Sequence, residues 1–142
     1  MTRSIYLLTL AAFAGCSSFA IEESGGTQVP ERRIFEKAAV GKGATDSDGS
    51  LLVLRDTGFL GGGCNHTFYL DSRKVFEIGV NERIEIHAPA GRHLLRIEDA
   101  TLLCPGTTTS VETVLEAGRQ QVYRIQLTGA QAVNLARFEP AP

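Results

Sequence analysis

Ser50-Leu51-Leu52-Val53-Leu54-Arg55 is the stretch that decides the fold of this chain. It is a nearly continuous apolar run, and turn-forming residues stand close to it on both sides: Asp48-Gly49 before it and Asp56-Thr57-Gly58 after it. A short apolar run with such boundaries is typical of a central strand that is buried on both faces. We therefore expect these residues to lie inside a sheet rather than at its edge.

Seven later stretches are also short β-type runs separated by turn residues. One of them, Arg83–His87, alternates cleanly, so that Ile84 and Ile86 are expected to face the core, and Arg83, Glu85 and His87 the solvent. The other runs are Thr67–Leu70, Lys74–Ile78, His93–Ile97, Ser110–Leu115, Gln121–Leu127 and Val133–Phe138. Because no helical run is long enough for a crossover between parallel strands, the pattern predicts an all-β domain over residues 49–142. We expect an antiparallel β-sandwich of seven to eight strands.

The preceding segment, residues 16–48, is expected to be a flexible tether. It contains Gly25-Gly26 and many other small or acidic residues, which bury too little apolar area to offset the entropy of ordering. Within it, Pro30–Ala39 could form a short helix with Ile34 and Ala38 on one narrow stripe. Such a helix would either lie across the domain or dock a partner.

Residues 1–15 have the pattern of an export signal. Arg3 supplies a positive start, and Ile5–Ala14 is an apolar run of about ten residues, too short to span a bilayer, which needs about 20. We expect this segment to be cleaved. Ser18-Phe19-Ala20 offers a small-x-small site at which an ordinary signal peptidase would release a soluble protein.

The end of the signal, Ala14-Gly15-Cys16, resembles the bacterial lipobox. The resemblance implies that lipid is attached to Cys16 and that the chain is cut just before it. Ser17 stands where an Asp holds many lipoproteins in the inner membrane, so the resemblance implies an outer-membrane lipoprotein facing the periplasm. Several acyl chains on one cysteine would anchor the protein stably, since each buried CH₂ contributes about 0.8 kcal/mol.

The chain has three cysteines. If Cys16 carries lipid, Cys64 and Cys104 remain as an even pair in an oxidising compartment, which favours a disulfide. Closing a loop of about 40 residues would stabilise the fold by roughly 4 kcal/mol. The alternatives are two free buried thiols or one nucleophilic cysteine.

The segment between Arg55 and Cys64 is the candidate recognition loop. Phe59 and Leu60 stand there among four glycines, so two large apolar side chains sit on a backbone of high freedom. Arg55 and Asp56 would add polar contacts to a ligand. The alternatives are that Phe59 folds back onto the core, and that Arg55 and Asp56 form a structural ion pair that braces the loop.

Other function classes find little support in the sequence. The net charge of -2 and the lack of a Lys/Arg block disfavour nucleic-acid binding. The two lone cysteines and three scattered histidines do not make a zinc set, so no metal or other cofactor is expected. No GxSxG, SxxK or phosphate-loop motif occurs. A small hydrolase would need His66, Asp56 and a serine to meet in one pocket.

Three turns resemble those of PEGA-type domains and their lipoprotein relatives: Tyr69–Val75, Ala88–Leu94 and Val114–Gly118 followed by Tyr123. A narrower likeness, to uncharacterised proteobacterial lipoproteins, adds Arg55–Cys64 and Leu103-Cys104. The resemblance covers roughly residues 29–127 and implies a β-sandwich with a non-enzymatic role in the envelope.

The sequence therefore predicts a lipid-anchored periplasmic binding or assembly module without enzymatic activity. Its membrane contact would be the lipid on Cys16, and its partner another envelope protein. The alternative is an inhibitor or immunity-type protein that plugs a secreted hydrolase with the Phe59 loop.

Overall fold

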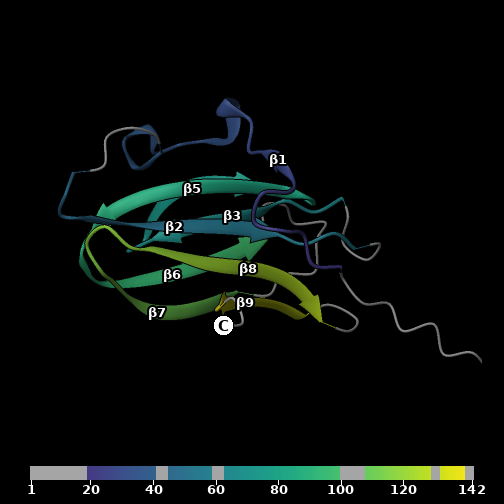
Figure 1. The fold of residues 1–142 in the computed structure, drawn as a ribbon. Helices are drawn as coiled ribbons and strands as arrows, with labels where there is room; N and C mark the ends of the chain where they lie inside the picture. The colour runs from purple at the N-terminus through teal and green to yellow at the C-terminus, as the bar shows by residue number, and fades with distance from the viewer. Residues whose placement is uncertain (1–18, 41–44, 59–62, 100–107, 129–131, 140–142) are drawn as a thin grey trace, which may run out of the picture.

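The computed structural model describes residues 19–40, 45–58, 63–99, 108–128 and 132–139, and these contain nine strands and two short 3₁₀ turns (Figure 1). Eight of the strands are those expected from the sequence, so the prediction of an all-β chain is confirmed. The predicted signal peptide and Cys16 lie outside the described residues, as do Phe59, Leu60 and Cys104. Over the described ranges, no helix is long and apolar enough to cross a membrane.

The larger sheet has five strands in the order β1-β5-β2-β8-β9. Its members are β1 (Thr27–Gln28), β2 (Asp48–Arg55), β5 (Glu82–Pro89), β8 (Gln120–Thr128) and β9 (Ala132–Phe138). The strand that contains the apolar run, β2, lies at the centre between β5 and β8.

The smaller sheet has four strands in the order β4-β3-β6-β7. Its members are β3 (His66–Leu70), β4 (Arg73–Ile78), β6 (Gly91–Asp99) and β7 (Thr109–Leu115). All of its pairings are antiparallel. The turn between β3 and β4 has positive φ at Asp71 and Ser72, as the two-residue hairpin turns of twisted strands require.

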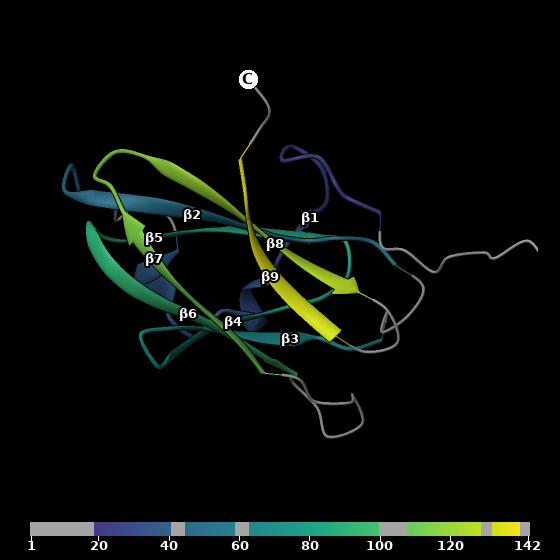
Figure 2. The same ribbon diagram turned by 90° about the horizontal axis from the view of Figure 1, so that it is seen from below.

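The two sheets lie one over the other, as the two views show (Figures 1 and 2). Leu51 and Val53 of β2 belong to one buried cluster with Phe68 of β3 and Phe76 of β4. The two phenylalanine rings are stacked with centroids 4.7 Å apart. The sheets therefore enclose a single main hydrophobic core, to which Ile84 and the other inward residues of β5 also contribute.

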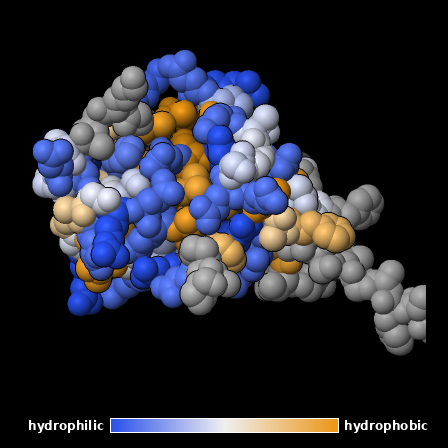
Figure 3. Space-filling model, viewed as in Figure 1, coloured by the Kyte–Doolittle hydropathy of each residue, from blue (hydrophilic) through white to orange (hydrophobic). Residues whose placement is uncertain are grey.

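The central strand is buried on both faces, as its apolar run predicts. Leu51 and Val53 face the main core, whereas Leu52 and Leu54 form a second cluster on the outer face with Ile21 and Val122. Figure 3, which shows the molecule from the same side as Figure 1, has a narrow hydrophobic seam between hydrophilic residues. The expected alternation along β5 is also confirmed, because Ile84 and Ile86 are buried and their neighbours are not.

The prediction of purely antiparallel pairing is wrong for the larger sheet. β2 pairs with β8 in parallel, and β1 pairs with β5 in parallel. Antiparallel order follows from hairpin loops, which join neighbouring strands directly. β2 and β8 are joined through the whole smaller sheet instead, so no loop dictates their relative direction.

The expected tether is also wrong over residues 19–40, which we call the strap. Its backbone pairs with β5 through β1, and Val29 and Ala39 are buried in the main core. The apolar side chains of the strap are scattered and show no strand or helix period, but Val29 and Ala39 are each covered by the sheets. Average composition conceals such an arrangement, because a handful of well-placed contacts is enough to order a short segment on an existing surface.

The expected short helix over Pro30–Ala39 is replaced by two 3₁₀ turns, η1 (Glu31–Arg33) and η2 (Lys37–Ala39). Between them, Ile34 forms an isolated bridge with Phe76, and the Phe35 amide donates to the carbonyl of Val75 at 2.8 Å. This part of the strap therefore lies across the domain and along the edge of β4.

Candidate functional site

The structure separates Arg55 and Asp56, which the sequence places side by side. Successive residues of a strand point to opposite faces. Arg55 follows Leu51 and Val53 toward the interior, whereas Asp56 follows Leu52 and Leu54 toward the outer face. Each is almost fully buried, and the ion pair of Asp56 is with Arg124 rather than with Arg55. The predicted pairing of these two side chains is therefore replaced by two separate clusters.

Asp56 is the centre of the outer cluster. Its Oδ1 accepts a hydrogen bond of 2.8 Å from Arg124 Nη1, and its Oδ2 accepts one of 3.1 Å from Gln126. The backbone amide of Ile21 in the strap donates to Oδ1 at 3.2 Å. The Asp56 side chain is 1% exposed, so the carboxylate is a buried charge that is paired and hydrogen-bonded. We call this set the Asp56 clasp.

Thr57, the residue after Asp56, pairs with Phe19 of the strap through backbone hydrogen bonds in both directions. The Phe19 amide donates to the carbonyl of Thr57 at 2.7 Å, and the Thr57 amide donates back to the carbonyl of Phe19 at 3.0 Å. The Thr57 hydroxyl also donates to that carbonyl at 3.0 Å. The strap is therefore attached to the end of β2 from Phe19 onward.

Arg55 belongs to an interior cluster at the same end of the sheets. His66 stands at the start of β3 and Asp99 at the end of β6, and the two residues are paired in the register of these strands. His66 Nδ1 lies 2.7 Å from Asp99 Oδ1, with both side chains less than a tenth exposed. The charge of Asp99 stabilises the Arg55 guanidinium. A cation, an imidazole and a carboxylate thus meet between the two sheets.

Burial and charge determine the protonation of this cluster. Burial lowers the pKa of Arg55 to about 10, against the raising effects of Asp99 and Asp56. Burial and the Arg55 charge lower the pKa of His66 to about 4, against the raising effect of Asp99. His66 is therefore neutral at physiological pH. The carboxylate beside His66 is that of Asp99, so the Asp56–His66 arrangement that a hydrolase would need is not formed.

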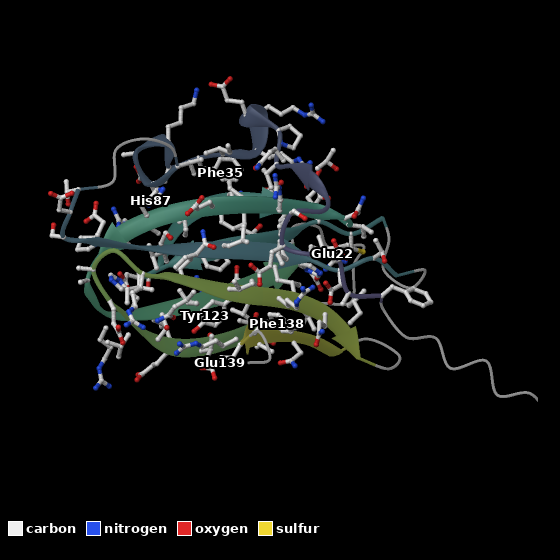
Figure 4. The ribbon with its side chains drawn as sticks, in the orientation of Figure 1. Glu22, Phe35, His87, Tyr123, Phe138 and Glu139 are labelled. Carbon is white, nitrogen blue, oxygen red and sulfur yellow. The ribbon has the colours of Figure 1, made fainter. Side chains whose placement is uncertain are left out.

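The other two histidines have different surroundings. His93 bridges two turns, since its Nδ1 lies 2.6 Å from Asp71 Oδ2 and its Nε2 lies 2.7 Å from the carbonyl of Pro89. Figure 4 labels His87, which lies half-buried on β5. Among the described residues, no three His, Cys, Asp or Glu side chains are grouped as a metal would require.

A groove lies on another side of the molecule, between the edge strands of the two sheets. β7 ends the smaller sheet and β9 ends the larger one, and Figure 2 shows them diverging from the end where Thr109 stands. The groove encloses about 450 Å³. Its lining consists of Arg92, Val111, Glu112, Thr113, Val114, Glu116, Tyr123 and Arg137.

Side chains hold the two sheets together along this groove. Thr109 Oγ1 donates to the carbonyl of Val133 at 2.7 Å, where β7 and β9 are closest. Further along, the Gln121 amide accepts from the Thr113 hydroxyl and donates to the carbonyl of Val114, both at 2.7 Å. The Val114 carbonyl therefore points toward β8 and away from β6.

The direction of that carbonyl identifies the outer edge of β7. The N–H and C=O of one strand residue point the same way, and the direction alternates from residue to residue. Ser110 and Glu112 therefore share the outward direction of Val114, whereas the intervening residues bond to β6. The side chain of Val114 is 56% exposed beside this edge.

Only part of this site could be predicted from the sequence. Arg55 and Asp56 were predicted as polar residues at a strand end, and both are central to buried clusters. Arg124, Asp99 and the groove were not predicted. The available signal was the alternation in Ser110–Leu115 and Gln121–Leu127, which marks strands but does not say which of them end a sheet. The pairing of Cys64 with Cys104 stays a prediction, because Cys104 lies outside the described residues.

Comparison with known proteins adds no further information about this site. No family model, curated protein or solved structure matches the chain.

Proposed function

We propose that this chain is a lipid-anchored binding module of the cell envelope, without enzymatic activity, whose β-sandwich domain takes up an extended segment of another envelope protein. Cys16 carries the lipid, and Cys64 and Cys104 form a disulfide. The observation that carries the binding function is the groove between β7 and β9.

The groove has the parts that strand addition uses. An extended peptide beside β7 would find the outward backbone groups of Ser110 and Glu112, and alternate side chains of the peptide would contact the groove wall. Val111 and Val114 supply apolar contact there. Arg92 and Glu112 form an exposed ion pair of 3.1 Å at the rim, which can exchange partners at little cost.

The start of the strap supports anchoring at Cys16. A chain that begins at Cys16 retains Phe19 and its three hydrogen bonds to Thr57. Cleavage after Ala20 would remove Phe19 and all three of them. Cleavage just before Cys16 therefore leaves a mature protein whose strap keeps more of its hydrogen bonds to the domain.

The location follows from the lipobox resemblance. Ser17 after the cysteine favours the outer membrane, with the domain in the periplasm. There the groove would meet other periplasmic domains or the periplasmic segments of membrane proteins.

A crosslinking pull-down from native membranes tests the binding function. In Glu112→Pro the edge of β7 loses an outward N–H, while the ladder to β6 keeps its hydrogen bonds. Glu112→Ala removes the same charge and keeps the N–H. We expect a partner that is captured by the wild-type protein and by Glu112→Ala but lost with Glu112→Pro. If both variants have the unfolding temperature of the wild-type protein and capture the partner equally, strand addition at β7 is ruled out.

Mass spectrometry of the mature N-terminus tests the anchor. The expected species begins at an acylated Cys16. An unmodified N-terminus at Ile21 would refute anchoring and leave the groove proposal intact.

A further inference from the structure

Phe19 is exposed although its backbone is held on the domain. Both its amide and its carbonyl are bonded to Thr57, yet the residue is 72% exposed. Two residues later, Ile21 is buried and bonded to the Asp56 clasp. A large aromatic side chain is therefore presented to the surroundings from a fixed backbone, at the end of the sheets where β2 ends.

The chain length between this point and the proposed anchor is very short. Cys16 precedes Phe19 by three residues, which span at most about 11 Å when fully extended. The eight residues of β2 alone extend about 26 Å away from this end. The whole domain thus stands within a few residues of the lipid, rather than at the end of a tether of some thirty residues.

We propose that the protein rests end-on on the bilayer, with Phe19 inserted in the headgroup layer of the leaflet that holds its acyl chains. This inference rests on the proposed lipidation of Cys16. The headgroup layer is roughly 5–8 Å thick on each side of the hydrocarbon, so the reach of three residues places Phe19 at its depth. Apolar rings are stabilised at that boundary.

Among the described residues at this end, no free positive charge faces the membrane. Glu22, labelled in Figure 4, is exposed close to Phe19 and would be repelled by anionic lipid. The cations of the described residues at this end are all bonded within the domain: Arg55, Arg124, Arg83 at the start of β5, and Arg33 of the strap. The contact should therefore form on neutral vesicles as well as on anionic ones.

The orientation determines how the groove is presented. Residue Thr109 of β7 lies at the membrane end, paired with Ile97, whereas Leu115 lies at the far end, paired with Gly91. The strands that border the groove diverge toward that far end (Figure 2). The groove therefore widens away from the bilayer, toward partners in the aqueous compartment.

Intrinsic fluorescence tests this orientation, because the chain contains no tryptophan. The probe is Phe19→Trp in the acylated full-length protein, reconstituted in phosphatidylcholine vesicles with or without brominated acyl chains. The matched control is Leu94→Trp, at an exposed position on the smaller sheet away from the membrane end. We expect brominated lipid to quench more than half of the tryptophan emission of Phe19→Trp and to leave the emission of Leu94→Trp nearly unchanged.

A second variant separates the orientation from the anchor. A Gly/Ser linker of about 20 residues, inserted between Ser18 and Phe19 of the Phe19→Trp protein, has a root-mean-square length near 25 Å. It should abolish the quenching while the protein still floats with the vesicles. If the Phe19→Trp protein without the linker floats with the vesicles but its emission is not quenched, the proposed orientation is wrong and the lipid anchor is not contradicted. A protein that is not acylated and does not float would overturn both.

Discussion

The two sheets meet along two sides, one of which is covered by the strap while the other is open. On one side the edge of β5 and the neighbouring β4 are covered by the strap, which adds backbone pairing through β1 and buries Val29 and Ala39. On the opposite side β7 and β9 diverge and leave a groove. Figure 4 shows Phe35 on the strap side, and Tyr123 and Phe138 on the groove side.

The two sides illustrate two arrangements of a sheet edge: one covered by main chain and one bridged only by side chains. Unpaired edge groups invite another strand, and proteins usually cover them. The strap covers its side with main chain from the same molecule. The groove side is held by one side-chain hydrogen bond from Thr109 and two at Gln121, which join the sheets without filling the edge. The proposed strand addition uses an edge that is held in this way.

The largest expected effect comes from breaking the clasp that holds the strap. Asp56→Ala leaves Arg124 buried without its carboxylate and frees the amide of Ile21. We expect the free energy of unfolding to fall by about 3–5 kcal/mol, measured by urea denaturation. The control is Glu112→Ala, whose exposed ion pair on the groove side is worth less than about 1 kcal/mol. Equal losses for the two variants would contradict a special role of the clasp.

The interior cluster around His66 should make the stability of the protein depend on pH. Neither side of the sandwich contributes a histidine to this effect, since the strap and the groove lining contain none. The pKa of His66 is lowered to about 4 from its ordinary 6.5, so between these values the unfolded chain binds more protons than the folded protein. Stability should therefore decrease as the pH falls from 6.5 through 4, by up to about 3 kcal/mol from this residue.

The measurement is urea denaturation of the wild-type protein and of His66→Gln at pH 7 and at pH 4. Other groups titrate in the same range, but they are common to both proteins. The wild-type protein should lose more stability than the variant over this range. An identical loss in the two proteins would show that His66 is not neutral in the fold.

Truncation of one valine on each side compares the two sides directly. Val29→Ala removes two buried carbons from beneath the strap and should lower the free energy of unfolding by about 2 kcal/mol. Val114→Ala, at an exposed position beside the groove, should change it by no more than about 0.5 kcal/mol. Thermal unfolding distinguishes these values. A large loss at Val114 would mean that the groove side is a structural surface rather than an available one.

A smaller effect than that of Val29→Ala is expected from the bridge across the groove. Gln121→Ala leaves the Thr113 hydroxyl and the Val114 carbonyl without their partner, but both stand beside the groove, where water can replace the amide. The loss should be about 1 kcal/mol rather than the roughly 3 kcal/mol of a sealed site. Gln120→Ala, which removes only an exposed bond to Glu85, is the matched control. A greater loss at Gln121 would show that the groove is dry.

Much of the fold could be predicted because strand signals are local. Alternation in Arg83–His87 and the continuous run in Ser50–Arg55 each report how many faces of a strand are buried. The strap could not be predicted in this way. Its burial depends on three well-separated apolar residues, Ile21, Val29 and Ala39, each of which meets a surface made by distant strands.

The candidate site was less predictable than the fold. Sequence reasoning chose Arg55 and Asp56 because they stand at a strand end, but it joined them to each other. Their real partners are Arg124 and Asp99, far along the chain. Adjacent strand residues point apart, so the neighbours of a strand-end charge lie on other strands, and only the strand order identifies them.

The sequence by itself determined that the chain is all-β, which strands it contains and which side chains face inward, because these follow from local periodicity. Only the tertiary structure decided the parallel pairing of β2 with β8, the closure of one side by the strap and the opening of the other as a groove. These features depend on contacts between segments far apart in the chain. Such contacts leave no periodic trace in either segment, because each is selected by a surface that exists only once the sheets have formed.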